Sequence, residues 1–216
     1  MRQNIAQEVA EYIRQLIFKG ELKAGEKVPQ DEIAERLGVS RFPVRQALEY
    51  LDGEGLVVTE HHRGSFVSKI ERQDLEDHYE MFGSIAGIAA RRAAECINED
   101  TLSTLVAMQQ KLREKEDPSE LHDIDWEFHR LINRTGGSRR LRLMLRSLGN
   151  NIPWSFFTVV PAASPTALAH HDAILQSLRD GNGDGAESWA RLHFRYEGAF
   201  VIDMLDKTGL WGDPDM

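Results

Sequence analysis

Apolar residues recur every three or four positions along most of this chain, which is the spacing of one face of an α-helix. Near the N-terminus, Ile5, Val9 and Ile13 mark a helix that should end before Gly20. Beyond residue 70 the same spacing predicts helices over 75–95, 99–115, 119–135, 139–160, 166–179 and 186–207. Residues 71–208 are therefore expected to form an all-α helical bundle, followed by a tail at 209–216.

Two short helices with a tight turn between them are predicted within residues 31–51. Ile33, Ala34 and Leu37 form the apolar face of the first, and Gly38 supplies a permissive backbone position where it ends. Ser40 is a suitable N-cap for the second helix. That helix should bury an apolar stripe formed by Val44, Ala47, Leu48 and Leu51. This pattern predicts a helix-turn-helix.

Two strand-like runs follow, Leu56–Thr59 and Ser65–Ser68, with a polar tip at residues 60–64 between them. A hairpin after a helix-turn-helix is typical of a wing. The expected fold is thus mainly α, with a winged helix-turn-helix over residues 1–70 and the helical bundle after it.

The outward face of the second short helix is expected to meet DNA. Arg41 and Arg45 lie near its N-terminal end, where a recognition helix presents donors to base edges and phosphates. Arg36 is expected to contact the DNA backbone, and Arg63 with Gly64 to do so from the wing. The candidate DNA-binding residues are Arg36, Ser40, Arg41, Phe42, Arg45, Arg63 and Gly64.

The net charge of −9 argues against nucleic-acid binding only until it is divided along the chain. Residues 1–70 hold ten Lys/Arg and eleven Asp/Glu, so the acidic excess lies in the bundle. The single cysteine excludes an intrachain disulfide and fits a reducing compartment. No apolar run spans a membrane, and the N-terminal residues lack a signal-peptide core. We therefore expect a cytoplasmic protein.

The bundle carries four metal-ligating side chains on its apolar stripes. Asp125 and His129 are four residues apart, so they are neighbours on one helix face. His171 and His193 lie on the apolar stripes of two later helices. Burying these groups without partners would cost several kcal/mol for each that stays charged. Three neutral imidazoles and one carboxylate suit one divalent transition metal per chain, Zn, Ni, Mn or Fe.

Simpler interpretations apply to single residues. A lone histidine on an apolar stripe is more often a hydrogen-bonded core residue than a ligand. The four residues together favour a metal site. His170 lies on a different helical face from His171 and is expected to be exposed. The run Asp180–Gly185 imitates half of a calcium loop, but position 191 holds Arg191 where the bidentate acid should stand. A helix-capping turn is expected there instead.

Several segments resemble a known family. Gly20–Val28, Val39–Leu48, Glu54–Val57 and Arg63-Gly64 resemble the reader head of GntR-family bacterial transcription regulators. The run Asp125–His129, with His171 and His193, resembles the metal tetrad of the FCD ligand-binding domain in the FadR branch of that family. This resemblance implies a homodimer on a pseudo-palindromic double-stranded DNA operator. It also implies a small organic acid as effector, held near the metal, and repression as the usual mode of action.

The sequence departs from that family at three positions. Phe42 stands where many relatives carry a small polar residue, which affects the expected operator sequence. In many FCD domains the first helix sends an Arg, and a Glu four residues later, toward the cavity, whereas this chain has Phe82 and Ala86 there. The effector arginine is thus missing, and Arg91, Arg130 or Arg195 could replace it. The candidate effector-pocket residues are Phe82, Ala86, Arg130 and Trp189.

Two other classes of protein remain open at this stage. A metal site with an open position could activate water in a metal-dependent hydrolase joined to a DNA-binding head. Glu197 is the only acid on the same faces that could act as its general base, and no nucleophile motif is present. Alternatively, the histidines only fill the core, and the protein then binds no stoichiometric metal. The leading hypothesis is a metal-containing transcription regulator, not an enzyme.

Overall fold

The structure is a computed structural model that describes residues 5–115, 117–149 and 162–207. The chain divides into two compact units. Leu75–Ile202 form one, and the residues before Leu75, together with the end of the last helix, form the other. No helix in the described ranges is long and apolar enough to span a membrane.

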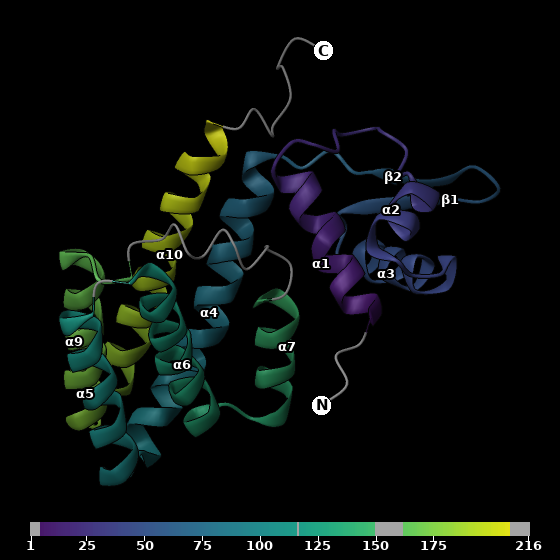
Figure 1. Cartoon of the computed structure of the whole chain (residues 1–216). Helices are drawn as coiled ribbons and strands as arrows, with labels where there is room; N and C mark the ends of the chain where they lie inside the picture. Colours follow the sequence, from purple (N-terminus) through teal and green to yellow (C-terminus); the bar gives the residue numbers. More distant parts are fainter. Residues whose placement is uncertain (1–4, 116, 150–161, 208–216) are drawn as a thin grey trace. The chain divides into compact units, whose positions relative to one another are not determined.

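The N-terminal unit is built on three helices, α1 (Ile5–Phe18), α2 (Gln30–Leu37) and α3 (Arg41–Gly53), which lie together in Figure 1. Ile13 and Leu51 are fully buried between α1 and α3, as the apolar stripes predict. Gly38 ends α2 in the left-handed region at φ 65°, where glycine avoids the Cβ penalty. Ser40 is the N-cap residue of α3, but its side chain makes no capping hydrogen bond.

The wing is the antiparallel hairpin of β1 (Val57–Glu60) and β2 (Gly64–Val67). Val57 pairs with Val67, and Glu60 pairs with Gly64. Both strands differ by one residue at each end from the predicted runs. Leu56 is buried just before β1 begins, and the turn closes at Gly64, where β2 begins. A bridge between Lys27 and Phe66 adds the preceding loop to the edge of the hairpin.

A nearly buried ion pair joins α1 to the end of α3. Arg14 is 5% exposed, and its Nη2 donates to both carboxylate oxygens of Glu54, at 2.9 and 2.7 Å. Charge-assisted pairs of this kind fix geometry as well as energy. The pair therefore holds the end of α3 on α1.

The second unit is built of helices, with no strand among its described residues. It comprises α4 (Arg72–Cys96), α5 (Glu99–Glu114), α6 (Pro118–Gly136), α7 (Arg139–Gly149), α9 (Pro165–Arg179) and α10 (Gly183–Asp206). The sequence predicts a helical pattern over 139–160 that Pro153 should kink or split. The structure ends α7 at Gly149, and residues 150–160 lie outside the described ranges. The predicted tail at 209–216 lies outside them too.

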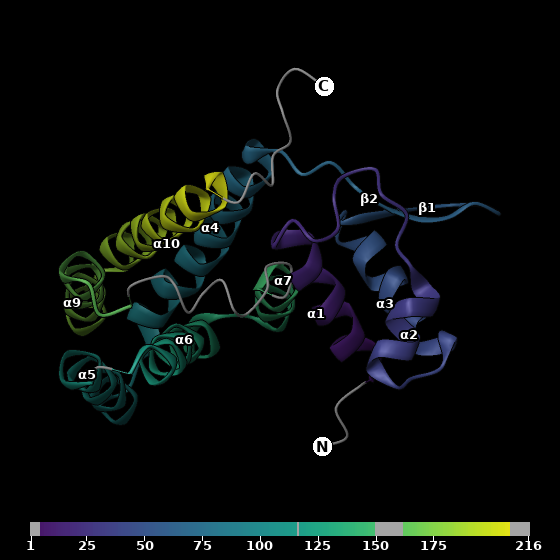
Figure 2. The same cartoon turned by 45° about the horizontal axis from the view of Figure 1, so that its top comes forward.

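Close helix packing explains the small residues of α4. Ala89, Ala90 and Ala93 are buried. A Cβ on Gly136, at the end of α6, would lie 2.0 Å from the carbonyl oxygen of Ala89. In both views α4 runs beside α10 (Figures 1 and 2), and Gly83 of α4 meets Phe194 of α10. Helices in such close contact hold their buried side chains in fixed positions.

Helix caps set where the bundle helices begin. Asn98 accepts a hydrogen bond from the Thr101 amide at the start of α5, and Ser164 accepts one from Ala167 at the start of α9. At the start of α10, Asn182 accepts a hydrogen bond from the Gly185 amide, at 3.0 Å. The segment that imitates a calcium loop is thus a capping turn, as the sequence predicts.

Candidate metal centre and nucleic-acid interface

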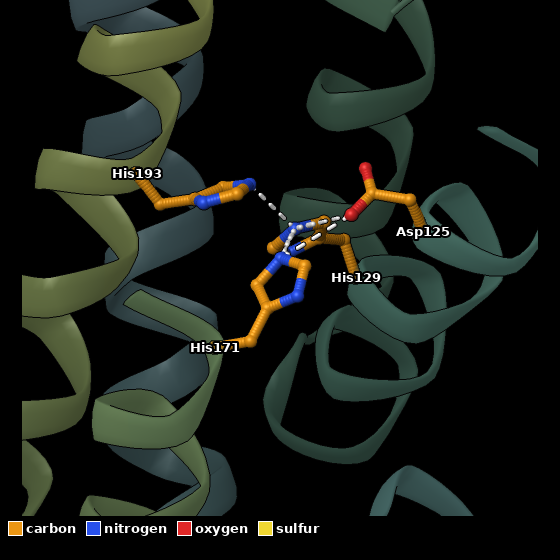
Figure 3. A group of neighbouring side chains, drawn as sticks. All are labelled: Asp125, His129, His171 and His193. Carbon is orange, nitrogen blue, oxygen red and sulfur yellow. Dashed lines mark hydrogen bonds and ion pairs between the residues drawn. The ribbon is translucent and has the colours of Figure 1, made fainter. Parts of the chain in front are cut away.

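The structure brings the four predicted metal-ligating residues into one buried cluster. Asp125 and His129 come from α6, His171 from α9 and His193 from α10 (Figure 3). We call these four residues the quartet. Their exposed fractions are 5%, 7%, 0% and 0%, in chain order. Three helices thus converge on one point in the core of the bundle.

The ligand atoms of the quartet all lie within 4.8 Å of one another. The Nε2 atom of His129 is 3.1 Å from Nε2 of His171 and 2.9 Å from Nε2 of His193. Oδ1 of Asp125 is 3.2 Å from Nε2 of His171. Metal–nitrogen bonds of ~2.1 Å place neighbouring ligand atoms roughly 3.0–3.4 Å apart. The spacing of these atoms therefore suits a single transition-metal ion.

A hydrogen-bond network fixes which nitrogen of His171 faces the cluster. Gln109 donates from Nε2 to the Leu168 carbonyl and to Asp172, both at 3.0 Å, so its Oε1 is the acceptor that faces Nδ1 of His171 at 3.1 Å. Nδ1 of His171 must then carry the proton, which leaves a lone pair on Nε2. Outer contacts of this kind orient metal-bound histidines.

Burial makes the quartet costly without a ligand. It raises the pKa of Asp125 well above its usual range, and the Glu197 carboxylate raises it further. Burial likewise lowers the pKa of His129 and His171 well below the ordinary value, with a smaller contribution from His193. Oδ1 of Asp125 has no hydrogen-bond partner within the part of the chain that the structure describes. A buried carboxylate oxygen facing neutral imidazoles is an arrangement that a cation stabilises.

His193 differs from the other two histidines because a second carboxylate contacts it. Glu197, one turn further along α10, places Oε1 3.1 Å from Nε2 of His193. Burial lowers the pKa of His193, but attraction and hydrogen bonding to Glu197, together with attraction to Asp125, outweigh this effect, and the net pKa is raised. Nδ1 of His193 is buried, and no described residue forms a hydrogen bond with it.

Aromatic rings surround the quartet. Phe128 stacks on His171 at 4.5 Å, and Phe194 lies 4.8 Å from the ring of His129. Phe82 contacts Phe194 edge-on at 4.7 Å, so this candidate effector residue lies one ring away from the quartet. These apolar walls keep the local dielectric low, which strengthens any charge interaction inside.

The proposed effector-pocket residues lie in two environments. Phe82 and Ala86 are buried on α4, whereas Trp189 is 38% exposed on α10. Arg130 is exposed and donates to Glu127 at 2.5 Å. The other two candidate arginines are also exposed and paired with acids: Arg91 with Asp184 and Glu187, and Arg195 with Glu80. The pocket itself stays a prediction.

Three further polar residues lie near the quartet. The sequence pattern places one of them wrongly and does not single out the other two. His170 is buried, not exposed, because its ring fits beside Trp189 and Tyr196 of α10. Gln109 interrupts the buried leucine stripe of α5, a signal that could have identified it. Tyr79 is 4% exposed, and its hydroxyl has no hydrogen-bond partner in the described part of the chain.

The candidate DNA-reading residues lie on the surface of the N-terminal unit. Arg41 makes an ion pair with Asp31, with Nε 2.6 Å from Oδ1, and Arg45 is exposed one turn later. Phe42 is 61% exposed, so its ring is available on this surface. Ser40 is exposed beside it.

The remaining reading residues extend this surface to α2 and the wing. The guanidinium of Arg36 lies over the ring of Tyr12, 5.7 Å from its centre. Arg63 pairs with Glu60 and lies over Phe66 in the wing, next to Gly64 at φ 113°. The predicted cations are thus all exposed.

Two protein families match this chain. Residues 5–67 match the family described as bacterial regulatory proteins, gntR family, and residues 77–196 match the FCD domain. The chain is 34% identical, over 69% of its length, to HTH-type transcriptional regulators from two strains of Mycobacterium tuberculosis, and it spans 62% of their length. It is 25% identical to the HTH-type transcriptional repressor RspR of Escherichia coli, over 97% of this chain and 94% of that protein.

A solved structure has the same fold. The E. coli protein McbR/YncC aligns over 94% of this chain and 99% of its own, with a TM-score of 0.68 and 19% identity. The matched families and relatives are transcription regulators and not enzymes. The predicted fold class, mainly α with a winged helix-turn-helix and a helical bundle, is confirmed.

Proposed function

This chain belongs to the GntR family of DNA-binding bacterial transcription regulators and carries an FCD domain, and we propose that it is a metal-containing repressor released by a small carboxylate. The observation that carries this proposal is the buried quartet, whose ligand atoms lie within 4.8 Å of one another. A regulator that only needed a packed core would fill these positions with apolar side chains. The metal-dependent hydrolase is set aside because the families and relatives are regulators.

The reader heads act as a pair in this proposal. Two chains form a homodimer, and each places α3 in one major groove of a pseudo-palindromic operator. Arg41 and Arg45 contact base edges or phosphates from α3, with Ser40 and Phe42 beside them. Phe42 is exposed and can pack on a thymine methyl group. Arg36 and the wing residues Arg63 and Gly64 contact the backbone, which sets register rather than sequence.

The quartet would hold one divalent ion, Zn, Ni, Mn or Fe, through three Nε2 atoms and Oδ1 of Asp125. When bound, the metal supplies a positive charge that can attract an effector carboxylate. Gln109 supports this role because it keeps a lone pair on Nε2 of His171. The ion would also stabilise the buried Asp125 carboxylate.

The effector pocket is proposed beside the quartet, toward α4. Phe82 and Ala86 would form its apolar wall, and Trp189 would border it from α10. The buried Tyr79 hydroxyl offers a donor for a polar group of the effector. Arg130 would have to leave Glu127 to contribute, so we rank it below the others. The absence of an arginine at Phe82 leaves the metal as the main anchor for a carboxylate.

Two measurements test the proposed function. Metal content is determined on untagged wild type, His171→Ala and the control His61→Ala, a wing-tip histidine far from the quartet in sequence and exposed. We expect about one transition metal per chain in wild type and in the control, and none in His171→Ala. Operator binding is then titrated with small carboxylates, which should release wild type from DNA. No metal in wild type after incubation with Zn, Ni and Mn would overturn the proposal.

A further inference from the structure

Glu197 is a buried carboxylate that contacts one ligand nitrogen of the quartet. It is 7% exposed, and its Oε1 is 3.1 Å from Nε2 of His193. The separations between contacting members of the quartet are of the same size, 2.9–3.2 Å. Ligands that share one metal keep about this distance from one another.

The nitrogen that Glu197 contacts decides between two roles. A supporting carboxylate ordinarily accepts a hydrogen bond from the imidazole nitrogen that faces away from the metal. Glu197 instead contacts Nε2 of His193, which faces His129 at 2.9 Å, while Nδ1 has no hydrogen-bond partner among the described residues. The carboxylate thus lies on the side of the imidazole that faces the cluster, which is the side from which a second ligand approaches the same ion.

We propose that Glu197 is a fifth protein ligand of the metal and holds the position that an effector carboxylate would otherwise take. This inference rests on the proposed metal centre. A glutamate side chain has three rotatable bonds, so its carboxylate can take more than one orientation beside His193. A divalent metal bound by two carboxylates and three neutral imidazoles is a centre with no net charge.

Charge neutrality has a consequence for the effector. A centre of zero net charge attracts an external carboxylate less than one with a net positive charge. The missing arginine at position 82 has the same effect. Both features favour an effector that displaces Glu197 by fitting the pocket rather than by charge alone. Glu197 therefore competes with the effector carboxylate for one position on the metal, and the effector must displace it before the protein is released from DNA.

The test uses the whole 216-residue chain loaded with Co²⁺, whose visible spectrum reports coordination number. The variants are Glu197→Gln, Glu197→Ala and the matched control Glu187→Gln, which changes an acid paired with Arg91 on the same helix. Zinc affinity is measured by chelator competition, and acetate is the carboxylate probe. Circular dichroism checks that each variant is folded.

We expect Glu197→Gln and Glu197→Ala to bind zinc at least about tenfold more weakly than wild type. Their Co²⁺ spectra should differ from wild type, and acetate should restore the wild-type spectrum in Glu197→Ala while leaving wild type and the control unchanged. Unchanged Co²⁺ spectra in both variants, with no response to acetate, would overturn the inference even if zinc affinity fell. Failure of folded wild type to bind any metal would overturn the proposed metal centre itself.

Discussion

The two candidate sites differ most in how their charges meet water. In the DNA-reading head, the side chains of Arg41 and Arg63 are 74% and 71% exposed and pair only with surface acids. In the bundle, His171 and His193 are fully buried. Exposed ion pairs contribute at most about 1 kcal/mol to stability. Buried ionisable groups cost several times more unless a partner satisfies them.

Because of this difference, one site should affect mainly DNA affinity and the other should also affect folding stability. The cations of the head are solvated in the free protein. Substituting them should therefore change the affinity for DNA and hardly change the free energy of unfolding. The quartet has no such freedom, because three helices hold it away from solvent. Its ligand should therefore appear in the stability of the protein as well as in regulation. Four predictions examine this contrast, in decreasing order of expected effect.

The largest effect should follow metal removal. A ligand that binds only the folded state raises the free energy of unfolding by about 4 kcal/mol at a free concentration 1,000 times its Kd. We expect saturating Zn²⁺ to stabilise wild type by this order of magnitude in urea unfolding, and to stabilise His171→Ala hardly at all. His61→Ala should respond as wild type does. Equal stabilisation of wild type and His171→Ala would show that zinc binds elsewhere.

Arg45→Ala should weaken operator binding without changing stability. A good side-chain contact to a base is worth about 1–3 kcal/mol, or roughly 5- to 150-fold in Kd. The operator is first selected from random DNA with wild-type protein, and Kd is then measured at fixed salt. Arg179→Ala, an exposed arginine in the last turn of α9, is the control. Unchanged operator affinity in Arg45→Ala would mean that α3 does not contact the operator as proposed.

Much of the head was predictable because its signals are local. Gly38, Ser40 and the apolar stripe of α3 lie within a few residues of one another, and each acts on the backbone nearby. The strands were displaced by one residue, since the exact point where a hairpin closes depends on cross-strand pairing. The helix ends of the bundle were predicted to within a few residues for the same reason, where Asn98 and Asn182 cap them.

The quartet was predictable for a different reason, and only in part. Helical periodicity places Asp125 and His129 on one face of α6 and His193 on the apolar face of α10. It does not say how far apart these two helices lie. Gln109 acts across helices through its amide orientation, which no spacing rule reveals. His170 was misplaced because α10 covers a face of α9 that the pattern treats as outer.

His78 is a half-buried histidine of the bundle that is not part of the quartet. Burial lowers its pKa to about 4, whereas an unfolded histidine titrates near 6.5. The unfolded state therefore binds more protons between these values, and stability is lost as the pH falls from about 6.5 to 4. We expect wild type to lose about 1–2 kcal/mol more than His78→Gln between pH 7 and pH 5. If the free energies of unfolding of wild type and His78→Gln, measured in urea, fell equally between pH 7 and pH 5, other groups would cause the acid sensitivity.

The smallest effect should come from Asp31, which holds Arg41 in an exposed ion pair. Because such pairs are weak, Asp31→Asn should leave stability within about 1 kcal/mol of wild type. It should nevertheless tighten DNA binding a few-fold, since it removes a negative charge near the phosphates and frees Arg41. Asp203→Asn, which removes an equally exposed acid paired with Lys207, is the control. The gain should shrink as salt rises, because the Debye length falls from about 10 Å at 0.1 M to about 3 Å at 1 M. A loss of affinity in Asp31→Asn would mean that Asp31 positions Arg41 for DNA rather than competing with it.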